Sequence, residues 1–383
     1  MGFDLLLGGG PDNRLFSDDL LSCLVEVRVE QSLDAPSRFA VRFQDDIEDG
    51  KLKKTGLPPL QVGQLVTVVI DCGNGDYTCL CRGPITEHES QVTRGGPGSS
   101  FTVLGPDRRD ELTHTPRDQN WSGRASDVAQ MLIAASYPLV EVDRTDEVYD
   151  LNGHSLAQRG TDLDFLTRTA ADNGLHFWIA YTNTAALPSG SLSVTETAKW
   201  KASPPLQTGL PAGVPPALPL APDAITLRHN VPNDQCPNLT KFTLRTDTSR
   251  PSAARSSTTN LTDGQRDPVQ ATDQASPMGG QGQGLAQRAP TRTMQPRPLS
   301  GQRNLQRRSE AALRDAGFFV SAEISTTRYL LKNVLEPHQV VAVEGVGGAN
   351  GKTPFRVKSV THVINGIGHF MDAVIETNVQ IPG

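Results

Sequence analysis

Residues 158–180 read QRGTDLDFLTRTAADNGLHFWIA. Thr161 and Asp164 stand three residues apart, the spacing of a helix capping box, and Asp162 adds negative charge at the positive end of the helix dipole. The apolar positions that follow recur at helical spacing, namely Leu163, Leu166 and Ala170. Gly174 suits the left-handed end of a helix, and the aromatic run after it favours a strand. The stretch therefore predicts a capped helix that leads directly into a β-strand.

The length of 383 residues allows two or three domains with hydrophobic cores. Hydrophobic residues make up 37%, but no run approaches the ~20 apolar residues of a membrane span, and residues 1–7 lack the features of a signal peptide. The net charge of -6 gives no general attraction to nucleic acid or to an anionic membrane. Five cysteines, an odd number, suit reduced buried thiols. We therefore expect a globular protein with no membrane insertion and no nucleic-acid binding.

The chain up to about Leu112 alternates between apolar and polar side chains, as half-buried strands do. Two runs have expected inward faces made of Cys23, Val25, Val27 and Val29 in one, and Phe39, Val41 and Phe43 in the other. The turn residues 73–76, Gly-Asn-Gly-Asp, indicate a hairpin between the runs on either side. The pattern predicts an antiparallel barrel or sandwich, and we assign residues 1–115 to a first β-barrel.

Between about Thr113 and Lys199 the apolar period becomes that of a helix. One helical stripe consists of Ala125, Val128, Ala129, Leu132 and Ala135. Ser122 and Ser126 are the candidate N-caps of this helix, and Pro138 closes it. The helix and strand within 158–180 follow. We assign residues 116–200 to a small α+β bridging module.

Residues 201–383 begin with a Pro/Gly-rich connector and contain a polar segment at 246–302. The segment is dominated by Ser, Thr, Pro, Gly, Gln and Arg, a composition that buries too little apolar surface to offset its ordering entropy by itself. No acidic residue occurs between Asp273 and Glu310, but six arginines do: Arg288, Arg292, Arg297, Arg303, Arg307 and Arg308. The first interpretation is a solvated loop. The second is docking on an acidic neighbouring subunit through Arg288, Arg292, Arg297 and Arg303, with order gained only in the assembly.

The last part of the chain echoes the first. Leu60-x-x-x-Gln64-x-Val66-x-Val68 aligns with Leu335-x-x-x-Gln339-x-Val341-x-Val343, and Thr86-Glu87-His88 aligns with Val360-Thr361-His362. Duplication of one unit explains both echoes, and chance explains either one alone. We expect a helix over 303–316, ended by Gly317, and then strands. We assign residues 201–383 to a second, related β-barrel that carries the polar segment as an insertion.

Three parts of the sequence occur in an order that one family shares. They are the N-terminal barrel, a motif made of Asp162, Asp164, Phe165, Leu166, Arg168 and Gly174, and an ending with Leu335-x-Pro337, Val341-x-Val343, Val357-x-x-Val360-x-His362 and Ile375-Glu376-Thr377. In these features the chain resembles the contractile-tail baseplate hub family, which includes the VgrG proteins of type VI secretion and the late control protein D of contractile phages. It departs from that family at His338, where glycine is usual, and in the polar insertion.

The resemblance implies a mainly β (α+β) fold with two related tube-protein-like antiparallel β-barrels and a small bridging module. It implies a structural baseplate hub, a homotrimer that adapts a hexameric inner tube to a trimeric spike beside other baseplate proteins of a contractile phage tail or injection system. Assembly in the cytoplasm and incorporation into the particle are expected, and release outside the cell is an alternative. Because the chain ends at Gly383, we expect a stand-alone hub whose spike is another polypeptide.

We predict no enzyme activity, cofactor or metal. The glycine-rich run 345–353 differs from a phosphate-binding loop in length and context, and Cys79-x-Cys81 is expected to place two thiols on one strand face without a full set of zinc ligands. Residues 107–111, Asp-Arg-Arg-Asp-Glu, are expected to form a solvated charged turn. The histidines in strands or turns are expected to be structural, namely His88, His362 and His369. The alternative function is a hub-associated peptidoglycan hydrolase, which would need a separate catalytic domain.

Overall fold

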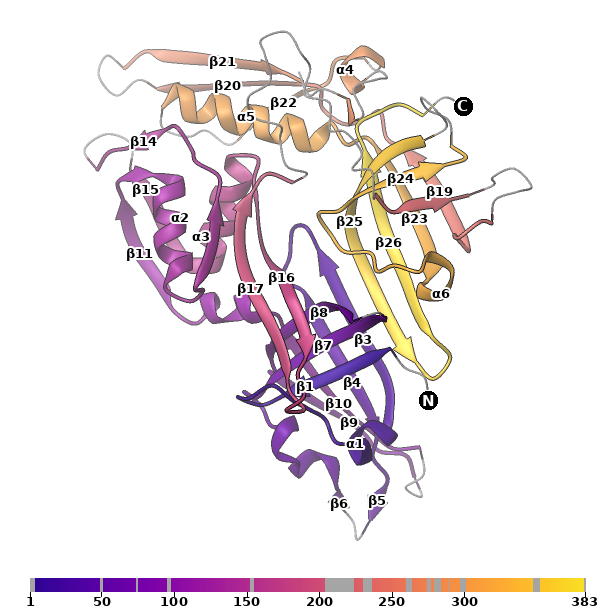
Figure 1. The fold of residues 1–383 in the computed structure, drawn as a ribbon. Coiled ribbons are helices and arrows are strands. Elements are labelled where there is room, and N and C mark those ends of the chain that lie inside the picture. The colour runs from indigo at the N-terminus through magenta and orange to yellow at the C-terminus, as the bar shows by residue number, and fades with distance from the viewer. Residues whose placement is uncertain are drawn as a thin grey trace.

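The structure is a computed structural model that describes residues 4–48, 51–73, 75–94, 98–151, 155–203, 224–229, 236–259, 264–273, 277–278, 284–288, 290–296, 301–346 and 352–381. Strands dominate it, and most of them pair in antiparallel sheets, which confirms the expected mainly β (α+β) class. Figure 1 shows the arrangement of its parts. No helix in the described ranges has both the length and the apolar character needed to cross a membrane.

The first β unit, residues 4–113, has two sheets around one core. One sheet has the order β2-β1-β7-β8 and consists of β1 (Leu5–Gly9), β2 (Arg14–Leu15), β7 (Leu65–Gly73) and β8 (Asp76–Pro84). The second sheet contains, in this order, β3 (Leu24–Ser32), β4 (Arg38–Gln44), β10 (Ser100–Pro106) and β9 (Glu87–Gln91). Side chains from both sheets form the core, including Leu7, Val68, Phe43 and Phe101. The short elements are α1 (Asp18–Ser22), β5 (Ile47–Glu48), β6 (Lys51–Leu52), η1 (Lys54–Gly56), η2 (Pro58–Leu60) and η3 (Arg108–Thr113).

The second β unit, residues 224–246 and 318–381, continues the second of these sheets. Its elements are β18 (Thr226–Arg228), β19 (Lys241–Thr246), β23 (Val320–Thr327), α6 (Arg328–Leu331), β24 (Val340–Glu344), β25 (Lys352–Asn365) and β26 (His369–Thr377). The strand order β19-β23-β26-β25 runs straight into β3-β4-β10-β9, because β25 pairs antiparallel with β3 from Ser359↔Ser32 to Asn365↔Glu26. With β24 and β18 this sheet has ten strands. Main-chain hydrogen bonds therefore join the two units directly.

The two β units repeat one arrangement of strands. The order β3-β4-β10-β9 corresponds to β19-β23-β26-β25, and the hairpin β7–β8 corresponds to β24 with the first half of β25. The registers agree at the aligned positions: Leu65↔Pro84 and Val66↔Gly83 in the first unit match Val340↔Arg356 and Val341↔Phe355 in the second. The duplication suggested by the sequence alignment is therefore present in the fold.

The bridging module, residues 116–203, packs helices against a small sheet. β11 (Pro116–Trp121) pairs with β15 (Leu156–Thr161), β12 (Gly123–Arg124) pairs with β14 (Val148–Tyr149), and β13 (Leu139–Val142), β17 (Leu192–Lys201) and β16 (His176–Ala186) form a sheet. The helices are α2 (Ala125–Ala134) and α3 (Asp162–Asp172). The predicted helix-to-strand stretch is confirmed as α3 and β16. The β16–β17 hairpin reaches the first β unit, where Leu192 packs with Val69 and Cys79.

The polar segment contains more regular structure than its composition predicts. A sheet of order β21-β20-β22 is formed by β20 (Ala253–Thr259), β21 (Arg266–Thr272) and β22 (Thr293–Met294), and α4 (Leu285–Arg288) lies between the last two in the sequence. Helix α5 (Gln302–Ala316) packs on β20 and β21 (Figure 1), and its Leu313 contacts Ala254 and Ala271. The interpretation as a solvated loop is wrong for these strands, because a helix beyond the segment supplies the apolar cover that the segment lacks.

Local irregularities overturn three smaller expectations. Val25 is 37% exposed instead of sharing the buried face of Val27, because the β3–β4 register shifts between residues 24 and 26. Cys79 and Cys81 lie in different hydrophobic clusters, because β8 is bulged opposite residues 68 and 69 of β7. Neither predicted serine caps α2. Arg124 holds the N-cap position, and the amide of Ser126 donates to Thr145 Oγ1 at 3.2 Å.

Candidate interaction surfaces

The start of α3 carries a polar network around the buried side chain of Asp162. The Thr161 hydroxyl accepts from the amide of Asp164, and the full capping box is present. Asp162 is only 7% exposed; its carboxylate accepts from Arg117 at 2.8 and 3.1 Å and from Gln158 Nε2 at 2.7 Å. The sequence argument found the cap but missed Arg117 and Gln158, because both come from β11 and β15 and are brought to the helix by the tertiary fold. These polar motif residues therefore tie α3 to its neighbouring strands.

The other motif residues hold α3 in place. Phe165 and Leu166 are buried, and Trp200 Nε1 donates to the Leu166 carbonyl at 3.1 Å. Arg168 is exposed and donates to the carbonyl of Ala157 at 2.7 Å. Gly174 has φ +68°, and a Cβ there would lie 2.8 Å from Arg314 Nη1. The left-handed backbone favours glycine here, and Ala311 of α5, whose Cβ would lie 3.3 Å from an added Cβ, leaves little room for a side chain.

The arginines proposed for docking have different environments. Arg292 and Arg303 are exposed, whereas Arg297 and the side chain of Arg288 lie outside the described residues. The next two arginines pair within the chain: Arg307 with Asp146, and Arg308 with Asp172 at the end of α3. Arg307 and Arg308 of α5 thus hold this helix on the bridging module, and a cation is also favourable at the C-terminal end of the α3 dipole.

Residues 107–111 form a buried ion pair, and the expectation of a solvated turn is wrong. Asp107 is 1% exposed and Arg109 3% exposed. The Arg109 guanidinium donates to Asp107, to the Phe177 carbonyl at 2.7 Å and to the Ala35 carbonyl at 3.1 Å. The pair is buried because η3 lies where β8, β16 and α3 meet. With its donors committed to structure, Arg109 joins the first β unit to the bridging module and does not resemble a catalytic group.

The histidines named from the sequence have structural contacts. His88 Nε2 lies 2.7 Å from the Leu60 carbonyl, and His362 lies between His369 at 2.9 Å and Gln31 Oε1 at 3.1 Å. No group of three or more potential metal ligands occurs among the described residues. Residues 347–351 of the glycine-rich run 345–353 lie outside the described residues.

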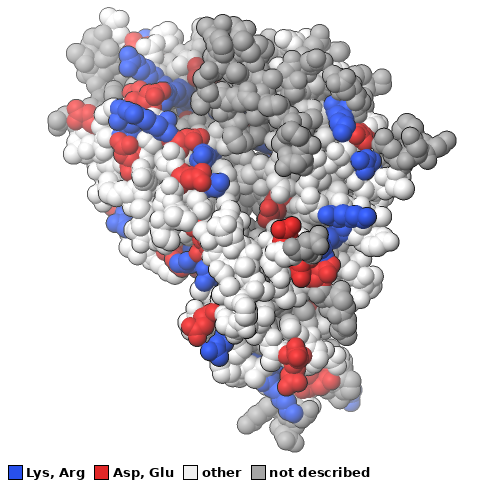
Figure 2. Space-filling model, in the orientation of Figure 1, with Lys and Arg blue, Asp and Glu red and all other residues white. Residues whose placement is uncertain are grey.

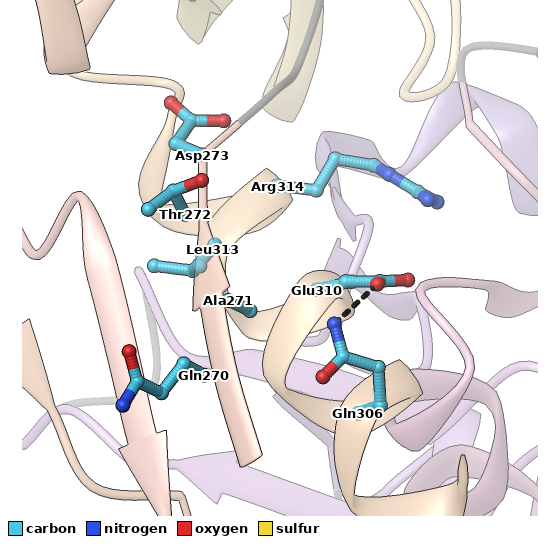
Figure 3. A pocket seen from close by; sticks show the side chains of 8 residues that line it. All are labelled: Gln270, Ala271, Thr272, Asp273, Gln306, Glu310, Leu313 and Arg314. Carbon is cyan, nitrogen blue, oxygen red and sulfur yellow. Dashed lines mark hydrogen bonds between the residues drawn. The ribbon is translucent and has the colours of Figure 1, made fainter.

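A polar hollow near the arginine-bearing segment lies between β21 and α5. Figure 3 shows its lining, Gln270, Ala271, Thr272, Asp273, Gln306, Glu310, Leu313 and Arg314, around a volume of about 360 Å³. Glu310 accepts a hydrogen bond from Gln306 at 2.7 Å, and the Arg314 side chain extends away from Asp273 (Figure 3). These lining residues include no histidine or cysteine, and their carboxylates are not paired as an acid and a base. We find no catalytic arrangement in this hollow.

The ten-stranded sheet ends in two strands whose outer edges pair with no other described strand. At one end, all five residues of β9 are exposed and two of them are Glu87 and Glu89. At the other end, β19 is mostly exposed and carries Lys241 and Arg245. Elsewhere on the face drawn in Figure 2, acidic and basic side chains are interspersed. Open sheet edges of opposite charge are suited to head-to-tail association between copies.

A second surface feature is apolar. Tyr329 of α6 is 88% exposed and Ile367, in the turn between β25 and β26, is 87% exposed. Leu330 and Phe370 are also exposed, and α6 lies beside β26 at the same end of the second β unit (Figure 1). Large apolar side chains gathered on a surface mark a site that another protein can cover.

The fold defined by these sheets is that of phage tail proteins. No known family model matches the sequence, and no curated protein matches it significantly. Among solved structures, the 43 kDa tail protein of prophage MuSo2 from Shewanella oneidensis has a TM-score of 0.60 at 15% identity over 97% of both chains. The tail protein from Neisseria meningitidis MC58 has a TM-score of 0.62 at 16% identity over 97% of this chain and 96% of that chain.

A third solved structure extends the likeness to secretion systems. The E. coli c3393 protein, a component of the type VI secretion system described as similar to the T4 tail proteins gp27 and gp5, has a TM-score of 0.51 at 10% identity over 94% of this chain and 76% of that chain. The resemblance to the baseplate hub family that the sequence motifs indicated is thus confirmed at the level of the fold.

Proposed function

We propose that this protein is a structural, non-enzymatic baseplate hub of a contractile phage tail or injection system. The observation that carries the proposal is the match in fold to tail proteins along 97% of both chains. The repeated β unit supports it, because two related units in each of three copies would present six similar modules to a hexameric tube. A trimeric spike would meet the same ring at its threefold symmetry. The proposed location is the baseplate of the particle, after assembly in the cytoplasm.

The proposed role of each part of the chain follows the expected domains. Residues 1–115 and 201–383 would form the two tube-like modules, and residues 116–200 would bridge them. The described cores support this division, since each part contributes most of one cluster of buried apolar side chains, and the first cluster also takes in Val334 and Ile364 from the second part. The polar segment at 246–302 would face other baseplate proteins through Arg288, Arg292, Arg297 and Arg303.

The internal seam between the two units suggests how copies associate. Within one chain, β25 pairs with β3, and these strands correspond in the repeat to β9 and β19. The unpaired edge of β9 in one copy can therefore meet the unpaired edge of β19 in the next copy as β25 meets β3. Such contacts are heterologous, and they close into a ring when the rotation per copy fits.

The same equivalence fixes a register for this contact. Val363 lies opposite Arg28 in the internal seam. Through the strand pairings of the two units, Glu89 takes the place of Val363 and Lys241 takes the place of Arg28. Glu89 of one copy would then face Lys241 of the next, a favourable cross-strand pair of opposite charge.

A charge exchange tests the hub and its seam together. Native mass measurement of the purified protein, or of the particle, should give three copies per ring. Glu89→Lys alone and Lys241→Glu alone should each weaken the trimer by placing like charges opposite each other, and the double variant should restore it. Asp118→Lys, a reversal at an exposed position on β11, is the matched control and should leave the trimer intact.

Two results would overturn parts of this proposal. Six copies for every hexameric tube ring would remove the symmetry-matching role. Trimers that persist in both single variants would remove the β9–β19 seam while leaving the hub in place. Cleavage of purified peptidoglycan by the wild-type chain would favour the hydrolase alternative.

A further inference from the structure

The loops that lead into β7 and β24 make the same main-chain hydrogen bonds but carry different side chains. In the first unit, the Gly63 amide donates to the Ile85 carbonyl at 2.8 Å, and the Ile85 amide donates to the Gln64 carbonyl at 2.9 Å. In the second unit, the His338 amide donates to the Val357 carbonyl at 3.2 Å, and the Val357 amide donates to the Gln339 carbonyl at 2.9 Å. The repeat therefore places His338 where the first unit has Gly63.

This position has a left-handed backbone in both units. Gly63 has φ +86° and His338 has φ +70°. The left-handed region is natural for glycine and uncommon for a residue with a side chain, so a histidine persists there only when its surroundings hold it. A Cβ at Gly63 would meet nothing within 4 Å. The difference between the units must therefore lie in what surrounds the imidazole.

The imidazole of His338 is inserted into the bridging module. It stacks on the Trp178 indole with ring centroids 3.8 Å apart and 14° between the planes, and it meets His176 edge to face at 6.0 Å. Its Nδ1 lies 2.9 Å from the hydroxyl of Ser203. All three partners belong to the bridging module, so one side chain fastens the second β unit to it.

The same ring borders a cavity of about 120 Å³ where the three parts of the chain meet. Gln31, Ser32 and Ser37 come from the first unit, Trp178 to Tyr181 from the module, and Glu336 to His338 from the second unit. The Nε2 atom of His338 is buried and has no hydrogen-bond partner among the described groups. With Nδ1 donating to the Ser203 hydroxyl, Nε2 carries the free lone pair, and a proton can add there without breaking a hydrogen bond.

We propose that His338 is an acid-sensitive latch: the neutral imidazole locks the loop before β24 to the bridging module, and a proton on Nε2 releases it. This inference does not depend on the proposed hub function.

The charges around the latch oppose the protonated form. The basic groups that face it are His176 on β16, Lys199 on β17, Arg109 on η3 and Arg356 on β25. Each of the four has a carboxylate partner of its own: Asp34 for His176, Glu141 for Lys199, Asp107 for Arg109 and Glu376 for Arg356. Burial, followed by these cations, holds the pKa of His338 well below its usual range. Although the indole face attracts a cation, it is one favourable contact against burial and the basic groups around the ring.

Glu336, in the same loop, works in the opposite direction. Burial raises the pKa of its carboxyl to about 7, so release of the loop would let Glu336 lose a proton while His338 gains one. In the wild type these two changes offset each other between about pH 4.5 and 6.5, the ordinary values for the two groups. The titration of His338 is therefore best measured in Glu336→Gln, which keeps the size and the hydrogen-bonding capacity of the side chain.

Hydrogen exchange on the full chain tests the latch. Exchange in the peptides covering β16 and residues 334–344 is followed at pH 7, 6 and 5 in Glu336→Gln, with correction for intrinsic rates. Opening of these segments should rise about tenfold per pH unit below 6.5, because each opening binds one proton. Adding His338→Gly, which suits the left-handed backbone, should increase opening at pH 7 and abolish its dependence on pH. His338→Asn, which also tolerates this backbone, should act in the same way and serves if the glycine variant does not fold.

The β7–β8 peptides provide the internal control, since Gly63 occupies the equivalent loop there. Their exchange should show no pH dependence that His338 controls. An equal pH slope with and without His338, or no slope in Glu336→Gln, would overturn the latch.

Discussion

The first and second β units share their strand order, their hairpin register and a fully buried leucine in the entry loop, Leu60 in one and Leu335 in the other. They differ in how they meet the rest of the chain. At corresponding positions the first unit has Pro84 and the second has Arg356. Arg356 is buried, binds Glu376 through Nε at 2.7 Å, and donates to the Ser203 carbonyl at 2.9 Å and to Asp315 at 3.1 Å.

The difference shows that a repeated backbone can serve two environments when a few side chains change. Arg356 and His338 both reach Ser203, at the end of the bridging module, and the guanidinium of Arg356 also lies 3.6 Å from the centroid of the Phe318 ring. The second unit is thus fastened to the module by polar side chains that the first unit lacks at the same positions. Four predictions test this contrast.

The largest effect is expected from Arg356→Ala. Removing the guanidinium leaves the Glu376 carboxylate buried with Lys358 at 3.3 Å as its remaining cation, and the loss in free energy of unfolding should be about 3–5 kcal/mol. Pro84→Ala, at the corresponding position of the first unit, is the control and should cost less than about 1.5 kcal/mol. Urea denaturation followed by fluorescence measures both. Equal losses of stability in the two variants would show that the unpaired Glu376 charge adds no extra cost.

Leu60→Ala and Leu335→Ala should come next, at about 3 kcal/mol each, because both side chains are fully buried and both truncations leave cavities. Since β25 and β3 join the units by main-chain hydrogen bonds, each variant should shift one shared unfolding transition. Calorimetry distinguishes the possibilities. Two separate transitions, with only the mutated unit affected, would contradict a cooperative seam.

Acid should weaken the β25–β3 seam through the neighbouring side chains of His362 and His369. Burial, with Arg328 nearby, lowers the pKa of His369 to about 4, and burial, with His369 nearby, holds the pKa of His362 well below its usual range. Depressed histidine pKa values give stability that is present above about pH 6.5 and lost as the pH falls, because the unfolded chain binds the proton first. One such histidine therefore lowers the free energy of unfolding by roughly 2 kcal/mol between pH 7 and pH 5.

Because Glu336 acts in the opposite direction, the measurement is the difference between the wild type and His369→Asn. The wild type should lose roughly 2 kcal/mol more than the variant between pH 7 and 5 in denaturant titrations. Parallel losses in the two proteins would assign the acid response to other groups.

The smallest effect is expected from Gly63→Ala. The position has open space around it, so only the strain of φ +86° opposes a methyl group, and the cost should be about 1 kcal/mol. Gly56→Ala, also in open space but without a positive φ, should be neutral or slightly stabilising. Thermal unfolding of the two variants separates backbone strain from packing. A Gly63→Ala variant as stable as the wild type would mean that the loop readily adopts another conformation.

Much of the local structure could be predicted because its causes are local. The Thr161–Asp164 cap, the helix end at Gly174 and the strand after it depend on neighbouring residues, and the structure confirms all three. The aligned hairpins could also be predicted, because strands with one buried face alternate apolar and polar side chains. The contacts of Asp162 with Arg117 and Gln158 could not be predicted, since they join residues separated by up to 45 positions.

By itself, the sequence determined the α3–β16 stretch, the repeated hairpin and the resemblance to tail hubs, because capping, periodicity and turn chemistry act over a few residues. Only the tertiary structure decided which polar groups are buried and what covers the polar segment. Asp107 and Arg109 look like a solvated turn until β8, β16 and α3 surround them, and β20 and β21 look unstructured until Leu313 of α5 covers them. Burial and charge pairing are set by segments distant in the chain, so composition alone does not reveal them.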